Sequence, residues 1–220
     1  QIADCAMRAG VKQFIYASSG SVYGVKEESQ VTEDLSLVPI SVYNKTKMVA
    51  ERVLLSYQDQ LQVHCIRPAT VCGWSPRMRL DVSVNMLSLQ ALKNGHITVF
   101  GGQQTRPNIH IQDMVRVYQH FIEKPDLPSG CYNAGFENIS ILDIAEQVKE
   151  KVPSEIVVSE SNDPRSYRQN SDKLQSTGFT PKFSVADAIE EVIEKYRNGA
   201  LNDDDQCYTV RWMKHLKLNQ

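Results

Sequence analysis

Two spacings of apolar residues alternate along the chain and predict helices and strands in turn. Residues 42–57 have helical spacing, with apolar side chains at Val42, Met48, Val49, Val53, Leu54 and Tyr57. Further helices are expected over residues 81–94, 112–123, 140–152 and 184–198, and a helix end over residues 1–9. Short apolar runs predict strands at residues 12–18, 62–66, 97–100, 130–133 and 156–158. This alternation is typical of an α/β protein with a parallel sheet.

Tyr43 and Lys47 lie near the start of the predicted helix 42–57. Because they are four residues apart, both side chains project from one helical face. A lysine ammonium beside a phenol favours the phenolate, and such a tyrosine can take a proton from an alcohol. Tyrosine and lysine are also ordinary residues on helix faces, so the pair gains meaning only from its context.

The context is a predicted strand that runs into a turn rich in hydroxyl groups, Ser18-Ser19-Gly20-Ser21-Val22-Tyr23-Gly24. Serines at the end of a strand place their hydroxyls at the carboxyl edge of a sheet, where open parallel sheets bind ligands. A serine turn followed by Tyr-x-x-x-Lys resembles the extended short-chain dehydrogenase/reductases, the NAD-dependent nucleotide-sugar epimerase and dehydratase family. The resemblance runs from the first residues to about Asn198.

Three later segments carry the same resemblance. The run Arg67-Pro68-Ala69-Thr70-Val71-Cys72-Gly73 is similar to the family segment beneath the nicotinamide. Arg106 opens a segment similar to Arg-x-x-x-His-Val-x-Asp, in which the arginine meets the nucleotide diphosphate. Asp163-Pro164-Arg165 stands where the family has Asp-x-Arg after a glycine. His110 is expected to be structural, because strand alternation puts it on the face opposite its neighbours.

The resemblance implies a role for each matched position. The implied catalytic residues are Ser19, Tyr43 and Lys47. The implied contacts of the cofactor NAD are Ala17, Ser18, Tyr43, Lys47, Pro68 and Val71. The implied contacts of a nucleotide-sugar substrate are Ser19, Thr70, Asn85, Val99, Arg106, Asp163, Arg165 and Tyr167.

The resemblance also implies a reaction. Tyr43 would withdraw a sugar hydroxyl proton while hydride passes to NAD, and return of the hydride to the other face would give an epimer. Related 4,6-dehydratases carry a carboxylate directly after the catalytic hydroxyl residue, where this chain has Gly20 and Ser21. An epimerase is therefore expected, with a 4,6-dehydratase or a ketoreductase of the same family as alternatives.

The expected fold is α/β, namely the rear half of a Rossmann-like doubly wound parallel sheet with a smaller mixed α/β substrate-binding region. Residues 1–75 are assigned to the NAD-binding part, residues 76–200 mainly to the interleaved nucleotide-sugar region, and residues 201–220 to a C-terminal tail. The sequence has no Gly-x-Gly-x-x-Gly turn. About a hundred residues are therefore expected to precede Gln1. The second possibility is a truncated, non-catalytic binding or oligomerisation module.

Composition narrows the classes of partner. A net charge of -2 gives no support for nucleic acid or a membrane surface as a partner. No apolar run approaches the ~18 residues of a spanning helix. Five scattered cysteines without Cys-x-x-Cys spacing favour reduced thiols, a cytoplasmic setting and no metal site, with Cys72 as a buried core residue. By resemblance, the helix that carries Tyr43 is expected to pack in a homodimer.

Overall fold

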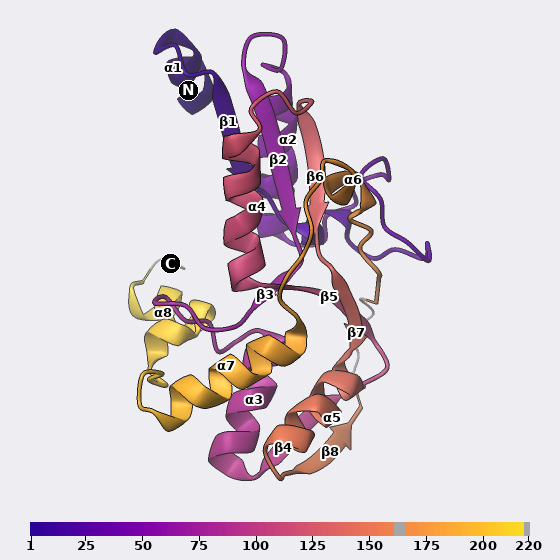
Figure 1. The fold of residues 1–220 in the computed structure, drawn as a ribbon, viewed down its shortest axis with the longest axis vertical. Coiled ribbons are helices and arrows are strands. Elements are labelled where there is room, and N and C mark those ends of the chain that lie inside the picture. Colours follow the sequence, from indigo (N-terminus) through magenta and orange to yellow (C-terminus); the bar gives the residue numbers. More distant parts are fainter. Residues whose placement is uncertain (161–165, 218–220) are drawn as a thin grey trace.

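Parallel strands and their covering helices organise the computed structural model, which describes residues 1–160 and 166–217 (Figure 1). Its helices are α1 (Ile2–Arg8), α2 (Val42–Leu55), α3 (Ser83–Asn94), α4 (Ile111–Glu123), α5 (Ile141–Lys151), α6 (Asp172–Ser176), α7 (Val185–Arg197) and α8 (Thr209–His215), with 3-10 turns η1 (Gly20–Tyr23) and η2 (Asp205–Cys207). Its strands are β1 (Gln13–Ala17), β2 (Gln62–Pro68), β3 (Thr70–Cys72), β4 (His96–Phe100), β5 (Thr105–His110), β6 (Gly130–Ala134), β7 (Glu137–Ser140) and β8 (Glu155–Ser159). No helix within these ranges is both long and apolar enough to cross a bilayer.

The upper sheet in Figure 1 contains β1, β2 and β6 in that order, all parallel. Alternate residues of β2 face opposite sides, as the period of a strand requires. Val63 and Cys65 pack with Leu54 of α2, whereas Ile66 packs with Phe121 of α4. The sheet is therefore covered by a helix on each face, which confirms the predicted α/β architecture with a parallel sheet.

The lower region has a mixed sheet of β3, β5 and β7 and a parallel pair of β4 and β8. Helices α3, α5 and α7 enclose its main core, in which Leu87, Val148 and Ile189 are almost fully buried. Between β5 and β7, which belong to the lower region, the chain returns to the upper sheet to form α4 and β6. The two regions are thus interleaved in sequence.

Local signals place several helix ends where the sequence predicts them. The Ser140 side chain accepts from the amide of Asp143 and begins α5. Ser184 and Asp187 form a reciprocal capping box at the start of α7. Gly95 adopts φ 67°, a left-handed conformation that ends α3.

Helix α2 differs from the expected apolar stripe. Val42, Val49 and Val53 are 77%, 52% and 51% exposed, whereas Glu51 and Leu54 face the interior. The face expected to pack on the sheet is therefore rotated, and a carboxylate occupies a core position. The physical reason is that Glu51 has a buried cationic partner, which helical spacing alone cannot show.

The long connection between η1 and α2 is anchored at its middle. Val31 is fully buried and bridges to Gln169 as in a parallel strand. Its amide donates to the Arg168 carbonyl at 2.7 Å, and its carbonyl accepts from Asn170 at 3.0 Å. The connection therefore packs against the chain instead of being a freely solvated link.

The C-terminal tail docks on the lower region. Cys207 is buried with Leu80 and Leu201, and the Thr209 amide donates to the Asp81 carboxylate at 2.9 Å. Lys93 also pairs with Asp203. The described part of the tail is therefore held against the lower region of its own chain.

Burial of His64 predicts a pH-dependent stability. The ring is fully buried, its Nε2 lies 2.9 Å from the Leu127 carbonyl, and burial lowers the pKa of His64. Below about pH 6.5 the unfolded chain binds a proton at His64 that the folded chain does not, so the free energy of unfolding falls as the pH falls. We expect His64→Gln to flatten this dependence by up to about 1.4 kcal/mol per pH unit. Urea unfolding at pH 7.5 and pH 5.5 measures the effect.

The matched control is His96→Gln, because His96 is exposed at the start of β4. This control should keep the pH dependence of the parent protein. An unchanged dependence in His64→Gln would contradict the assignment of the effect to His64.

Candidate functional site

The serine turn lies at the carboxyl end of β1 and is tied to the start of α2. Ser19 begins η1, and its Oγ lies 2.7 Å from the Oγ of Ser21. The Ser21 hydroxyl donates in turn to Oδ1 of Asn44 at 2.7 Å. Asn44 follows Tyr43 directly in the sequence, so two hydroxyl groups connect the turn to the helix segment that carries Tyr43.

Lys47 lies between two phenol rings at the same edge of the sheet. Its Nζ donates to the Ala17 carbonyl at 2.7 Å, at the end of β1. The same Nζ is 5.0 Å from the ring centroid of Tyr16 and 5.6 Å from that of Tyr43. Tyr43 is 56% exposed. The structure thus places an ammonium beside an accessible phenol where a parallel strand ends.

A buried ion pair supports the turn and the helix from below. Arg67 of β2 donates to both oxygens of Glu51 of α2, at 2.9 and 2.8 Å. The Ser18 hydroxyl donates to the same carboxylate at 2.5 Å. Burial opposes the charge of Arg67, but its hydrogen bonds to Glu51 together with the electrostatic effects of Tyr23, Cys131 and Glu51 raise the pKa of the guanidinium. One carboxylate therefore joins the ends of β1 and β2 to the middle of α2.

The hydrogen bonds continue across the sheet from Arg67. Its Nη1 donates to the Tyr23 hydroxyl at 2.7 Å, and that hydroxyl donates to Oδ1 of Asn133 in β6 at 2.8 Å. Burial raises the pKa of Tyr23 to about 12 although Arg67 acts in the opposite direction, so Tyr23 remains a neutral donor. We call Ser18, Glu51, Arg67, Tyr23 and Asn133 the buried polar chain.

Gly20 lets the serine turn approach the neighbouring segments closely. A Cβ at this position would lie 2.7 Å from Oε1 of Gln169 and 3.1 Å from the Pro68 carbonyl. Gln169 is 1% exposed, and its Nε2 donates to the Arg67 carbonyl at 2.7 Å. A side chain at position 20 would therefore displace the turn or disturb this packing.

The positions expected to contact a cofactor divide into two groups. Ala17, Pro68 and Val71 lie at or next to strand ends and are partly or fully accessible. Ser18 is 4% exposed, and its hydroxyl is directed inward to Glu51. The Ser18 hydroxyl thus donates its only proton to the buried carboxylate, and the cofactor contact expected for Ser18 stays a prediction.

Two positions expected to contact substrate have side chains in the interior. Val99 is fully buried in the core between β4 and the helices. Asn85 is 2% exposed. Its side-chain oxygen accepts from the Gly73 amide, and its side-chain nitrogen donates to the carbonyls of Gly73 and Arg79. Both side chains thus hold the lower region together. Val99 belongs to an apolar run that is consistent with burial, whereas the polar Asn85 carries no burial signal in the sequence.

The other expected substrate contacts are spread over β3, β5 and the loop after β8. Thr70 pairs with Asn108 across β3 and β5, and Arg106 is half-buried in β5. Tyr167 packs against the cluster formed by Val22, Tyr23 and Val31. Asp163 and Arg165 lie outside the described residues.

His110 has the structural position that strand alternation predicts. It is 4% exposed, its Nδ1 accepts from the Gln112 amide, and its ring stacks on Phe183. Its Nε2 lies 3.4 Å from Glu191 of α7, an acid that comes from a distant part of the sequence. Burial lowers the pKa of His110 against the opposite effect of Glu191.

Cys72 also occupies the core position expected for it. The residue is 1% exposed, and burial raises the pKa of its thiol to about 12. A thiol in this state is a poor nucleophile.

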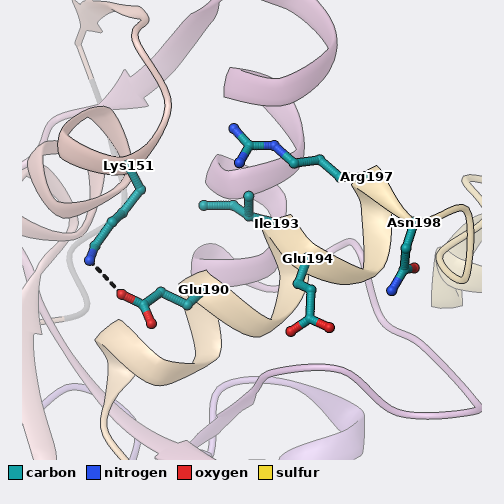
Figure 2. Close-up of a pocket in the computed structure, with 6 residues that line it drawn as sticks. All are labelled: Lys151, Glu190, Ile193, Glu194, Arg197 and Asn198. Carbon is teal, nitrogen blue, oxygen red and sulfur yellow. Dashed lines mark hydrogen bonds and ion pairs between the residues drawn. The ribbon is translucent and has the colours of Figure 1, made fainter.

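A surface hollow of about 600 Å³ lies elsewhere, along α7 beside the end of α5 (Figure 2). Its charged lining contains Lys151 and Arg197 with Glu190 and Glu194, and Lys151 pairs with Glu190. The opposite charges balance, so the hollow does not favour a diphosphate. Its lining includes none of the residues expected to be catalytic.

Sequence reasoning missed the residues that support the site. Glu51 follows Lys47 by four residues, as Lys47 follows Tyr43, so helical spacing places it on the same face, but its buried partner Arg67 gives no signal along the chain. Ser21 and Asn44 had no such signal, because their contact depends on how the turn meets the helix. Tyr16 was visible only as an apolar strand residue.

Comparisons with known proteins agree on one family. Residues 1–135 match the model of the "NAD dependent epimerase/dehydratase family". The chain is similar to the "Uncharacterized UDP-glucose epimerase YtcB" of Bacillus subtilis, at 31% identity over 142 residues that cover 64% of this chain and 45% of the relative. It is also similar to the dTDP-D-glucose 4,6-dehydratase of Mus musculus, at 24% identity with 91% of this chain and 60% of the relative covered.

Two solved structures have the same fold. MoeE5 in complex with UDP-glucuronic acid and NAD has a TM-score of 0.78 and 27% identity, covering 90% of this chain and 69% of that chain. UDP-glucuronic acid 4-epimerase from Bacillus cereus, in complex with UDP-glucuronic acid and NAD, has a TM-score of 0.77 and 26% identity, covering 90% and 65%. The chain spans 45% and 60% of the length of the two curated relatives.

Proposed function

Because the chain belongs to the NAD-dependent epimerase/dehydratase family, we propose that its full-length protein is a nucleotide-sugar epimerase that works through a transient keto sugar. Tyr43 takes the proton of the reacting sugar hydroxyl and later returns it. Lys47 supplies a positive charge beside the Tyr43 ring. Ser19 binds the sugar oxygen as it becomes a carbonyl.

The observation that carries the proposal is the Nζ of Lys47, 5.6 Å from the ring centroid of an exposed Tyr43. Tyr43 has a ring accessible to a ligand, and Asn44 beside it is tied through Ser21 to Ser19. The proton acceptor, its cation and the hydroxyl donor thus sit on two elements joined by direct hydrogen bonds. A general base needs this kind of fixed position near the proton that it removes.

The residues at this edge of the sheet suit the nicotinamide ribose of NAD. Lys47 and Tyr43 supply a cation and a hydroxyl beside the end of a parallel strand, where open sheets bind such ligands. Ala17, Pro68 and Val71 provide accessible neighbouring surface. When bound, NAD accepts a hydride from the sugar carbon and returns it. The Ser18 side chain has a supporting role through Glu51.

The packing of Gly20 favours an epimerase over a dehydratase. Loss of water next to the ketone needs an additional acid and base. The position after Ser19 has no room for a carboxylate, since even a Cβ would meet Gln169 and the Pro68 carbonyl. At the next position, the Ser21 hydroxyl is already hydrogen-bonded to Ser19 and Asn44. A ketoreductase lacks such a requirement and stays the second candidate, supported by the same Tyr43 and Lys47.

The substrate proposed is a sugar linked to a nucleoside diphosphate. Arg106 of β5 is the proposed diphosphate contact, because a guanidinium matches the geometry of phosphate oxygens. Thr70 lies on the adjacent strand β3, where it pairs with Asn108 of β5, and is proposed to contact the same substrate. Asp163, Arg165 and Tyr167 are proposed to complete this contact. The solved relatives bound to UDP-glucuronic acid make uridine sugars the first compounds to test.

A homodimer is proposed through α2. Val42, Val49 and Val53 form an exposed apolar stripe on this helix, and such stripes are typical of subunit contacts. The stripe runs beside the site, so a partner subunit would hold α2 in place. Sedimentation of the full-length protein tests the dimer.

The deciding experiment uses the full-length protein with a panel of UDP-sugars in deuterated water. An epimerase is expected to retain NAD through purification and to give the epimer without net reduction of NAD. Direct return of the hydride leaves the product without carbon-bound deuterium, whereas elimination by a dehydratase introduces deuterium and lowers the product mass by one water. Absence of both bound NAD and turnover would overturn the proposal. A reduced or dehydrated product would replace it by the corresponding alternative.

A further inference from the structure

Cys65 and Cys131 face each other on adjacent strands. Cys65 of β2 is paired in direct register with Cys131 of β6. Both side chains lie on the α2 side of the sheet, where Cys131 packs against the cluster that contains Cys65 and Leu54. Partners on neighbouring strands have Cα atoms about 5 Å apart, within the range of about 4.4–6.8 Å that a disulfide spans. The two thiols could therefore be joined without a large backbone movement.

The two thiols have different surroundings. Cys65 is fully buried, whereas Cys131 is partly accessible. Interaction with Cys131 and burial raise the pKa of Cys65, so this thiol keeps its proton. Interaction with Cys65, aided by Arg67 and Lys173 against the effect of burial, lowers the pKa of Cys131.

Lys173 is held in place beside Cys131. Its Nζ donates to the Cys131 carbonyl at 2.7 Å and lies 4.3 Å from the ring centroid of Tyr132. The ammonium is thus fixed at the backbone of Cys131, and its charge favours the thiolate of this residue. Because Cys131 is partly accessible whereas Cys65 is fully buried, a dissolved oxidant reaches Cys131 first, which makes Cys131 the attacking sulfur and Cys65 the resolving one.

We propose that Cys131 and Cys65 form a peroxide-sensitive dithiol. The Cys131 thiolate attacks the O–O bond of a hydroperoxide, which gives a sulfenic acid and releases hydroxide or alkoxide. The Cys65 thiol then attacks this sulfur, and water leaves as the disulfide forms. Both sulfurs are oxidised, the peroxide is reduced, and a thiol reductant reverses the change.

A disulfide between Cys65 and Cys131 would lie next to the residues that support the candidate site. Arg67 and Asn133 form the same-face register pair two residues further along the strands, and both belong to the buried polar chain. Closing the disulfide would fix the spacing of β2 and β6 beside the ion pair that supports α2. The dithiol rests on strand register and on the different burial of the two thiols, so it stands independently of the proposed enzymatic activity.

The remaining cysteines serve as internal controls. Cys5 is exposed, and Cys72 and Cys207 are buried in other clusters. If exposure alone governed oxidation, Cys5 would react first. If paired geometry governs it, Cys131 and Cys65 should react while Cys5 remains a thiol.

The test treats the full-length protein with a limiting amount of hydrogen peroxide and maps the products by peptide mass spectrometry. We expect a peptide linked through Cys65 and Cys131 that is two hydrogens lighter and that dithiothreitol separates. Cys65→Ala should leave a sulfenic acid at Cys131 that dimedone traps, and Cys131→Ser should leave Cys65 reduced. Cys5→Ser should change none of these products.

Three results would overturn the proposal. The first is oxidation of Cys5 while the pair stays reduced. The second is direct conversion of Cys131 to sulfinic acid in the parent protein without a linked peptide. The third is oxidation of Cys65 that persists in Cys131→Ser. Circular dichroism of each variant confirms that its fold is kept, and the measurement on the parent protein is decisive where a variant does not fold.

Discussion

Tyr43→Phe is expected to lower turnover of the full-length protein by at least about 10²-fold, the usual range for loss of a general base. The phenol is exposed and the Lys47 ammonium lies beside its ring. The substitution removes the hydroxyl and leaves the ring. Because the Tyr43 hydroxyl makes no hydrogen bond within residues 1–160 and 166–217, the fold should be kept. Steady-state rates on the substrate found in the panel, together with the NAD content after purification, measure the effect.

Tyr57→Phe provides the matched control for this prediction. Tyr57 follows the same helix and packs against the cluster on the far part of the sheet. Its substitution should leave turnover within about twofold of the parent, as expected for a residue outside the reacting groups. Normal turnover in Tyr43→Phe, with the control also normal, would remove Tyr43 from the mechanism.

Glu51→Gln is expected to lower the free energy of unfolding by about 3–5 kcal/mol. The carboxylate is 1% exposed and binds Arg67 through two hydrogen bonds and Ser18 through a third. Glutamine keeps the shape but leaves the buried guanidinium without a counter-charge. Urea unfolding at pH 7 measures the loss.

Lys151→Ala is the contrasting control for Glu51→Gln. It removes a surface ion pair with Glu190 in the hollow along α7, and exposed ion pairs contribute little to stability. The double replacement Glu51→Leu with Arg67→Met should recover much of the stability, because no buried charge is left unpaired. Equal losses in Glu51→Gln and Lys151→Ala would show that the buried ion pair contributes no more to stability than an exposed one.

The parts of the fold with strong local signals could be predicted from the sequence. Helices α5 and α7 combine apolar periodicity with serine caps, and both begin where Ser140 and Ser184 indicate. Strand β7, Glu137–Ser140, escaped prediction because it is short and largely polar. Its strand state comes from pairing with β5, a contact between segments far apart in sequence.

The site divides in the same way. Tyr43, Lys47 and Ser19 could be proposed because a spacing of four and a strand followed by serines are visible in the chain. The inward direction of Ser18 could not, since two adjacent serines look equivalent until Glu51 selects one of them. Val99 and Asn85 were placed by resemblance, and packing of the lower region directs both side chains into its interior.

The anchor at Val31 changes how the segment before Tyr43 can open. Three backbone or amide hydrogen bonds, to Arg168, Asn170 and Asn133, hold this one residue to two other segments. Residues 25–41 are thereby divided into two shorter arcs, each with less conformational entropy to gain on release. Release of the whole segment 25–41 therefore requires that the hydrogen bonds of Val31 break first. Such a release is a sub-global unfolding event, because it also frees the backbone of Arg168 and Asn170.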